Sequence, residues 1–196
     1  MAIDHAYFVR RLPMSLTTRF ILHWRKDLFA LIRECKKLDW LVLTKRPENI
    51  EKMLPSDWGD GYSNVWLGVT AEDQKWFDRR WKRLKRIPAA IRFISYEPAL
   101  GPVRLPPNGR LPDWLISGGE SGAGARPLKP QWVRDVIADC RRCGVAPFHK
   151  QWGTYHSNPL VMEKGMAARE AQKIDAEGKG GGLVDGKHVR EFPDRK

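Results

Sequence analysis

Apolar residues recur at helical spacing early in the chain and then in short continuous runs of strand length. Between Ser15 and Leu38 the spacing of three or four residues predicts an amphipathic helix. Its apolar face would carry Ile21, Trp24, Leu28, Leu31, Cys35 and Leu38. Residues 40–43 then form the first continuous apolar run, which predicts a strand buried on both faces.

Four further apolar runs follow, at residues 65–69, 91–95, 114–117 and, more weakly, 145–149. Helical patterns lie between them at residues 48–54, 72–86 and 131–143, and Gly144 can close the last helix as a C-cap. Strands that alternate with helices indicate parallel strands joined by right-handed crossovers. The sequence therefore predicts an α/β fold with about five parallel strands and outer helices.

The pattern ends after Trp152. Residues 164–182 are rich in Gly, Lys, Ala and Glu without periodicity, and we expect a flexible segment there. Apolar residues around Asp185-Gly186 predict a short hairpin at the C-terminal end. We therefore divide the chain into an N-terminal segment 1–26, a βα unit 27–155 and a flexible C-terminal tail 156–196.

Composition narrows the class of protein. A chain of 196 residues with 42% hydrophobic and 30% charged residues is typical of one globular domain. No apolar run is long enough to span a membrane, and no signal peptide is evident, so we expect a cytoplasmic protein that does not bind membranes. The net charge of +12 favours a polyanionic partner such as nucleic acid. Three cysteines predict no disulfide framework.

Polar residues gather directly after the five apolar runs. Because parallel α/β folds bind ligands at the carboxyl ends of their strands, these residues are the candidate site. Such a mixture of carboxylates, cations and amides suits a zwitterionic or phosphorylated ligand, or else structural ion pairs. The candidates are Lys45, Arg46, Glu72, Glu97, Gly118, Gly119, Glu120, Ser121, Arg126, Lys150 and Gln151.

Residues 118–127 form the most distinctive segment, with four glycines after an apolar run. Glycines there let backbone amides approach a ligand closely. Ala125 and Arg126 stand where a P-loop requires Lys and Ser or Thr, so the segment is not a P-loop. Cys140 and Cys143 fall within a predicted helix without a second cysteine pair, so we expect no metal site.

The predicted helix 72–86 carries a row of cations opposite its apolar stripe. Such a row could follow a phosphate backbone, or it could be the solvated face of a crossover helix. The nucleic-acid candidates are Lys75, Arg79, Lys82, Arg83 and Arg86.

The strand-end motifs together resemble one family, the phage and prophage proteins named after gp thirty-seven and gp sixty-eight. The motifs are Leu43-Thr44-Lys45-Arg46-Pro47-Glu48, residues 65–74, Arg92-Phe93-Ile94-Ser95-Tyr96-Glu97-Pro98, residues 118–127, Lys150-Gln151-Trp152-Gly153 and Leu183-Val184-Asp185-Gly186. This resemblance covers residues 27–193 and leaves the segment 1–26 unmatched. It implies a partial βα barrel similar to radical S-adenosylmethionine enzymes.

For the full-length family the resemblance implies S-adenosylmethionine and a [4Fe–4S] cluster. This chain is similar to the C-terminal half of the family and has no clustered-cysteine loop, so we expect no cofactor in the chain itself and no radical chemistry by itself. A half barrel would leave a strand edge open. The N-terminal helix, a second copy of the chain or a missing N-terminal half would cover it. The alternative function is a basic nucleic-acid-binding module.

Overall fold

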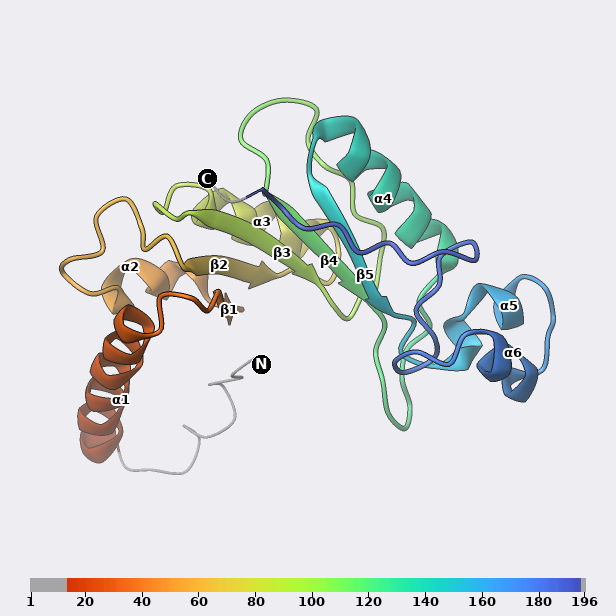
Figure 1. Cartoon of the computed structure of the whole chain (residues 1–196), viewed down its shortest axis with the longest axis horizontal. Coiled ribbons are helices and arrows are strands. Elements are labelled where there is room, and N and C mark those ends of the chain that lie inside the picture. The colour runs from red at the N-terminus through yellow and green to blue at the C-terminus, as the bar shows by residue number, and fades with distance from the viewer. Residues whose placement is uncertain (1–13, 195–196) are drawn as a thin grey trace.

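The structure, a computed structural model, describes residues 14–194, with side chains from residue 24 onward. Five parallel strands form one sheet in the order β1-β2-β3-β4-β5 (Figure 1). Their bounds are β1 Trp40–Thr44, β2 Val65–Thr70, β3 Ile91–Tyr96, β4 Trp114–Gly118 and β5 Ala146–Gln151. The predicted α/β class and the five parallel strands are confirmed, and the sheet is consistent with a partial βα barrel.

Six α-helices surround the sheet in the described part of the chain. They are α1 Met14–Glu34, α2 Ile50–Met53, α3 Gln74–Leu84, α4 Pro130–Cys143, α5 Pro159–Met162 and α6 Ala168–Ile174. Asp73 caps α3 by accepting a hydrogen bond from the Trp76 amide, and Gly144 closes α4 in the left-handed conformation. The predicted C-cap is therefore confirmed.

The helices α3 and α4 pack on one face of the sheet, here called the outer face (Figure 1). The buried core on this face joins Leu67 and Val69 of β2 with Phe77 and Leu84 of α3 and Val133 of α4. The outer face therefore accounts for most of the apolar periodicity seen in the sequence.

No described helix is long and apolar enough to cross a membrane.

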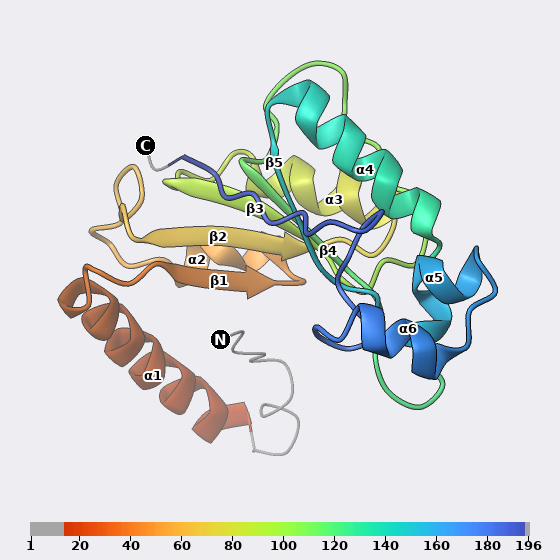
Figure 2. The same ribbon diagram turned by 45° about the vertical axis from the view of Figure 1, so that its right-hand side comes forward.

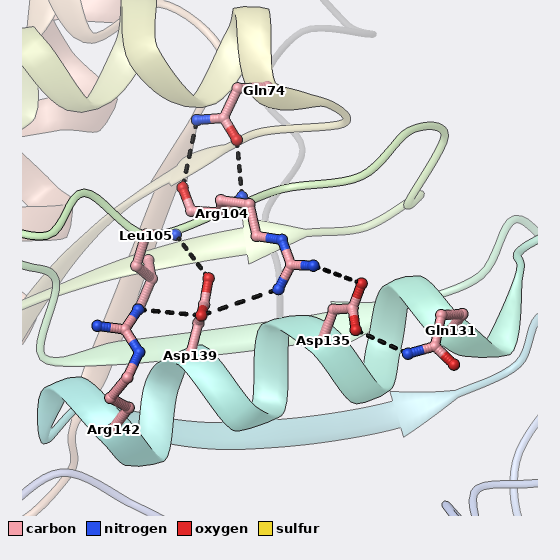
Figure 3. Close-up of polar contacts among 7 residues, drawn as sticks. All are labelled: Gln74, Arg104, Leu105, Gln131, Asp135, Asp139 and Arg142. Atoms are coloured by element: carbon pink, nitrogen blue, oxygen red, sulfur yellow. Dashed lines mark hydrogen bonds and ion pairs between the residues drawn. The ribbon is translucent and has the colours of Figure 1, made fainter.

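The connection between β3 and β4 is fastened to α3 and α4 by side chains (Figure 3). The Gln74 amide pairs with the backbone of Arg104, which donates to its Oε1 at 2.7 Å. The Arg104 guanidinium then reaches Asp135 on α4 at 2.7 Å, and the Leu105 amide donates to Asp139. These bonds fix the spacing between the two outer helices.

The opposite face, here called the inner face, carries an aromatic cluster centred on Trp114. The Trp114 ring makes contacts with Trp66, Phe93, Phe148 and Phe192 at centroid distances of 5.4–5.9 Å. Edge-to-face and tilted contacts of this kind are favourable. The inner face is therefore apolar near the amino ends of the strands.

The C-terminal segment differs from the flexible tail expected from its composition. It contains α5 and α6, and it is tied together by the buried carboxylate of Asp175, which accepts from Asn158 Nδ2, the Gly182 amide and the Leu183 amide at 2.8–3.0 Å. A single buried acceptor orders a loop that has too few apolar residues to show periodicity. The predicted hairpin corresponds to a bridge between Val184 and Lys187.

The end of the chain also covers one edge of the sheet. The His149 amide donates to the Val189 carbonyl at 2.8 Å, and the Glu191 amide donates to Pro147 at 3.0 Å. Residues 187–191 thus run along β5 (Figure 2). At the other edge, β1 pairs with β2 alone among the described residues. The resemblance led us to expect an open strand edge, and in the described part of the chain this edge is formed by β1.

Candidate functional site

The candidate residues lie at the carboxyl ends of the strands, beyond the aromatic cluster. We call this part of the molecule the rim and define it by Lys45, Glu72, Arg80, Glu97, Gly118, Gly119, Glu120, Arg126, Lys150 and Gln151. Parallel strands present their carboxyl ends on one edge, so residues far apart in sequence meet there. The rim consists of two clusters of polar side chains and one closed turn.

The first cluster is built around Glu72, which follows β2. Its carboxylate accepts from Lys45 Nζ at 2.7 Å and from Arg80 Nη1 at 2.8 Å, and Arg80 also donates to the Thr70 carbonyl. Burial opposes ionisation of Glu72, but the hydrogen bond from Lys45 and the charges of Arg80 and Lys45 outweigh it, so the pKa of the carboxyl is lowered. Glu72 is therefore an anion at neutral pH.

The second cluster joins β3 to β5. The Glu97 carboxylate accepts from Lys150 Nζ at 3.1 Å and from Gln151 Nε2 at 3.0 Å. The same amide group of Gln151 donates to the Gly119 carbonyl at 2.9 Å, which fixes its orientation. Its oxygen Oε1 is buried and has no hydrogen-bond partner among the described residues. The cluster therefore keeps an unused acceptor close to an ion pair.

Gly118 makes this second cluster possible. Glu97 follows β3 and Lys150 belongs to β5, and the strand between them, β4, ends at Gly118. A Cβ atom at Gly118 would lie 3.0 Å from Glu97 Cδ, so a larger residue would displace the carboxylate. A shift in register between Ser117 and Gly118 also places Gln151 opposite Gly118. The glycine lets the side chains meet across β4.

The turns after β4 and β5 pack backbone against backbone. A Cβ atom at Gly119 would lie 2.1 Å from the Trp152 carbonyl oxygen, and one at Gly153 would lie 2.1 Å from the Glu120 carbonyl oxygen. The Gly119 amide donates to the Gln151 carbonyl at 2.9 Å. No side chain other than hydrogen fits at either glycine, so the two turns form one rigid unit.

The glycine-rich turn is closed by Glu120 and Arg126. The Arg126 amide, Nε and Nη2 donate to the Glu120 carboxylate at 2.7–2.9 Å. The side-chain and backbone hydrogen bonds from Arg126 lower the pKa of Glu120 to about 2. The hydrogen bond to Glu120 in turn raises the pKa of Arg126, so both groups of this pair are charged at neutral pH.

The rim brings together most of the predicted site residues. Arg46 and Ser121 are exposed, and no side-chain bond links them to the rim within the described residues. Sequence reasoning missed Arg80, which is buried. The signal was present, because a cation occupies the inner stripe of α3 between Phe77 and Leu84, where an apolar residue is expected.

The five nucleic-acid candidates are all exposed along α3 and the turn that follows it. They are Lys75, Arg79, Lys82, Arg83 and Arg86. Arg79 packs against the Trp76 ring at 5.4 Å, and none of the five forms an ion pair with another described residue. The row predicted from sequence therefore exists as a positively charged surface.

The described surface also has two hollows away from the rim. One of about 580 Å³ lies between α1 and the loop after α2, and one of about 400 Å³ lies between α4, α5 and α6. Neither is lined by a rim residue. The rim is thus a polar surface rather than one of these hollows.

Comparison with known proteins identifies a family. A family model described as a protein of unknown function (DUF5131) matches residues 4–193. The chain belongs to the DUF5131 family. No curated protein and no solved structure matches it. The match begins at residue 4, so it includes most of the segment 1–26 that the strand-end motifs leave uncovered.

The cysteines of this DUF5131 chain do not fit an iron–sulfur cluster. Cys140 is buried in α4, and burial raises the pKa of its thiol to about 12. Cys35 lies in the short connection between α1 and β1, and β1 is the strand at the other edge of the sheet. Within the described residues no three His, Cys, Asp or Glu side chains come together as metal ligands. A cluster needs several thiolates in one place, and these residues do not supply them.

Proposed function

We propose that this chain is a half barrel of the radical S-adenosylmethionine-like type that binds a small charged molecule at the rim. The resemblance to the gp thirty-seven and gp sixty-eight proteins indicates a phage or prophage origin. The observation that carries the proposal is the gathering of polar side chains from all five strand ends at one edge of the sheet, with Glu97 and Lys150 meeting across Gly118. Ligands of parallel α/β folds bind at this position.

We further propose that the chain performs no radical chemistry by itself. Cys35 lies apart from Cys140 and Cys143 of α4, and Cys140 is held as a buried thiol, so the donor set for a cluster is absent from the described residues. A cysteine-bound iron–sulfur cluster with turnover of S-adenosylmethionine in the purified chain would contradict this.

The binding proposal is tested by NMR with a panel of charged small molecules. The panel contains S-adenosylmethionine, adenosine monophosphate, phosphoserine and free amino acids. We expect at least one to shift the backbone amides of residues 118–121 and 150–153. Glu97→Gln should change the affinity for that ligand about tenfold, because it removes the ion-pair partner of Lys150 and hydrogen bonds to charged groups contribute about 1.5–3 kcal/mol.

The exposed Glu51→Gln on α2 removes the same charge away from the rim and should leave affinity unchanged. The proposal is wrong if no member of the panel shifts the rim amides at millimolar concentration. It is also wrong if both variants weaken binding equally.

The exposed cations of α3 favour a second candidate function, a basic nucleic-acid-binding module. If these cations bind phosphates, replacing Lys75, Arg79 and Lys82 with Gln should reduce the slope of log affinity against log salt. The reduction should be about 0.9 for each phosphate of duplex DNA that the variant no longer neutralises. Fluorescence anisotropy with duplex DNA and single-stranded RNA over a range of salt concentrations measures this slope. Undetectable binding at low salt would exclude this function.

A further inference from the structure

Three of the four ion pairs of the rim share one arrangement, in which the cation lies outside and the carboxylate lies beneath it. Lys45 is 59% exposed over Glu72 at 12%. Lys150 is 57% exposed over Glu97 at 22%, and Arg126 is 59% exposed over Glu120 at 28%. A molecule that approaches the rim therefore meets positively charged groups first.

The carboxylates beneath are bound by other groups as well. The buried Arg80 donates to Glu72 at 2.8 Å, and Gln151 donates to Glu97 at 3.0 Å. The four cations Lys45, Arg80, Arg126 and Lys150 outnumber the three carboxylates of the rim by one. The rim therefore has a net positive charge, located on its exposed side chains.

The exposed cations also converge. Lys45 reaches from β1 to an acid that follows β2, and Lys150 reaches from β5 across Gly118 to an acid that follows β3. Their ammonium groups thus lie over neighbouring strands, whose axes are about 5 Å apart. Arg126 belongs to the same region, since it binds Glu120, whose backbone packs against Gly153 in the turn that follows Lys150 and β5.

We propose that Lys45, Arg126 and Lys150 form a subsite for the phosphate group of a phosphorylated small molecule. The inference rests on the proposed function and selects among its ligand classes. Lys45 uses one of its three N–H donors on Glu72, and Arg126 keeps Nη1 free, so a phosphate can bind without breaking the ion pairs. A phosphate dianion with three oxygens accepts from several cations at once.

Pyrophosphate is the probe for this subsite, titrated calorimetrically into the whole chain at low ionic strength. We expect Lys45→Met and Lys150→Met each to weaken pyrophosphate about tenfold, because each removes a charge-assisted hydrogen bond. Lys150→Arg should retain most of the affinity. The matched control Lys173→Met removes the same charge from an exposed position on α6 and should change affinity less than twofold.

Each outcome decides the proposal. Equal losses in Lys173→Met and Lys150→Met would show attraction by net charge only and would overturn the subsite. If a ligand without phosphate shifts the rim amides while pyrophosphate does not bind, the subsite is wrong and the rim still binds a ligand. If duplex DNA binds through Lys45 and Lys150 and pyrophosphate does not, the phosphate source is a nucleic acid and the proposal fails. Circular dichroism checks that each variant is folded.

Discussion

Gly153→Ala is expected to lower the free energy of unfolding by about 3 kcal/mol. Gly153 has φ +84°, where an alanine is strained, and its Cβ atom would lie 2.1 Å from the Glu120 carbonyl oxygen. Because the obstacle is backbone, no side-chain rotation relieves it. Urea unfolding followed by tryptophan fluorescence measures the change.

Gly124→Ala is the matched control for this prediction. Gly124 has φ +73°, close to that of Gly153, but no atom lies within 4 Å of its Cβ position. Gly124→Ala should therefore lower the free energy of unfolding by only about 1 kcal/mol, which is the strain of an alanine in the left-handed conformation. Equal losses in the two variants would mean that the turns after β4 and β5 separate without cost, which would contradict the rigid unit that holds the rim.

The repeating elements of this fold follow from the sequence, because each has enough residues to show its period. The helix α4 and the strand β2 were both predicted within a residue of their bounds. Parallel strands buried on both faces have continuous apolar sequences, and these are easy to recognise. The C-terminal segment was not predictable in this way, since it is ordered by the single carboxylate of Asp175 rather than by a periodic apolar face.

The residues of the rim were predictable, but their partners were not. The rule that ligands bind at strand ends selected Glu72, Glu97 and Lys150. The pairing depends on the register shift beside Gly118, which does not appear in a hydrophobic pattern. It also depends on the buried Arg80, which interrupts the apolar stripe of α3 without revealing its partner. The sequence thus predicted which groups lie at the rim, while the structure shows which carboxylate forms an ion pair with each cation.

His149 should make the stability of the protein depend on pH. The ring is fully buried on β5, with Nδ1 3.0 Å from Ser117 Oγ and the Trp152 ring 4.3 Å away. Burial lowers the pKa of His149 to about 3 from its usual 6.5. Between these two pH values the unfolded chain binds one proton more than the folded chain. The free energy of unfolding should therefore fall by about 1.4 kcal/mol for each pH unit of acidification.

The window from pH 6.5 to 5 isolates this effect, because carboxylates with lowered pKa, such as Glu72 and Glu120, are ionised there in both states. Urea unfolding should show a loss of about 2 kcal/mol across the window. His149→Gln should be less stable at pH 7 and should flatten the profile, whereas His156→Gln, at an exposed position, should keep the slope of the original chain. A slope that survives in His149→Gln would assign the proton to another group. If the stability of the original chain does not change with pH in this window, the fold accommodates protonated His149. The contacts of His149 with Ser117 and Trp152 would then not hold β5 rigid.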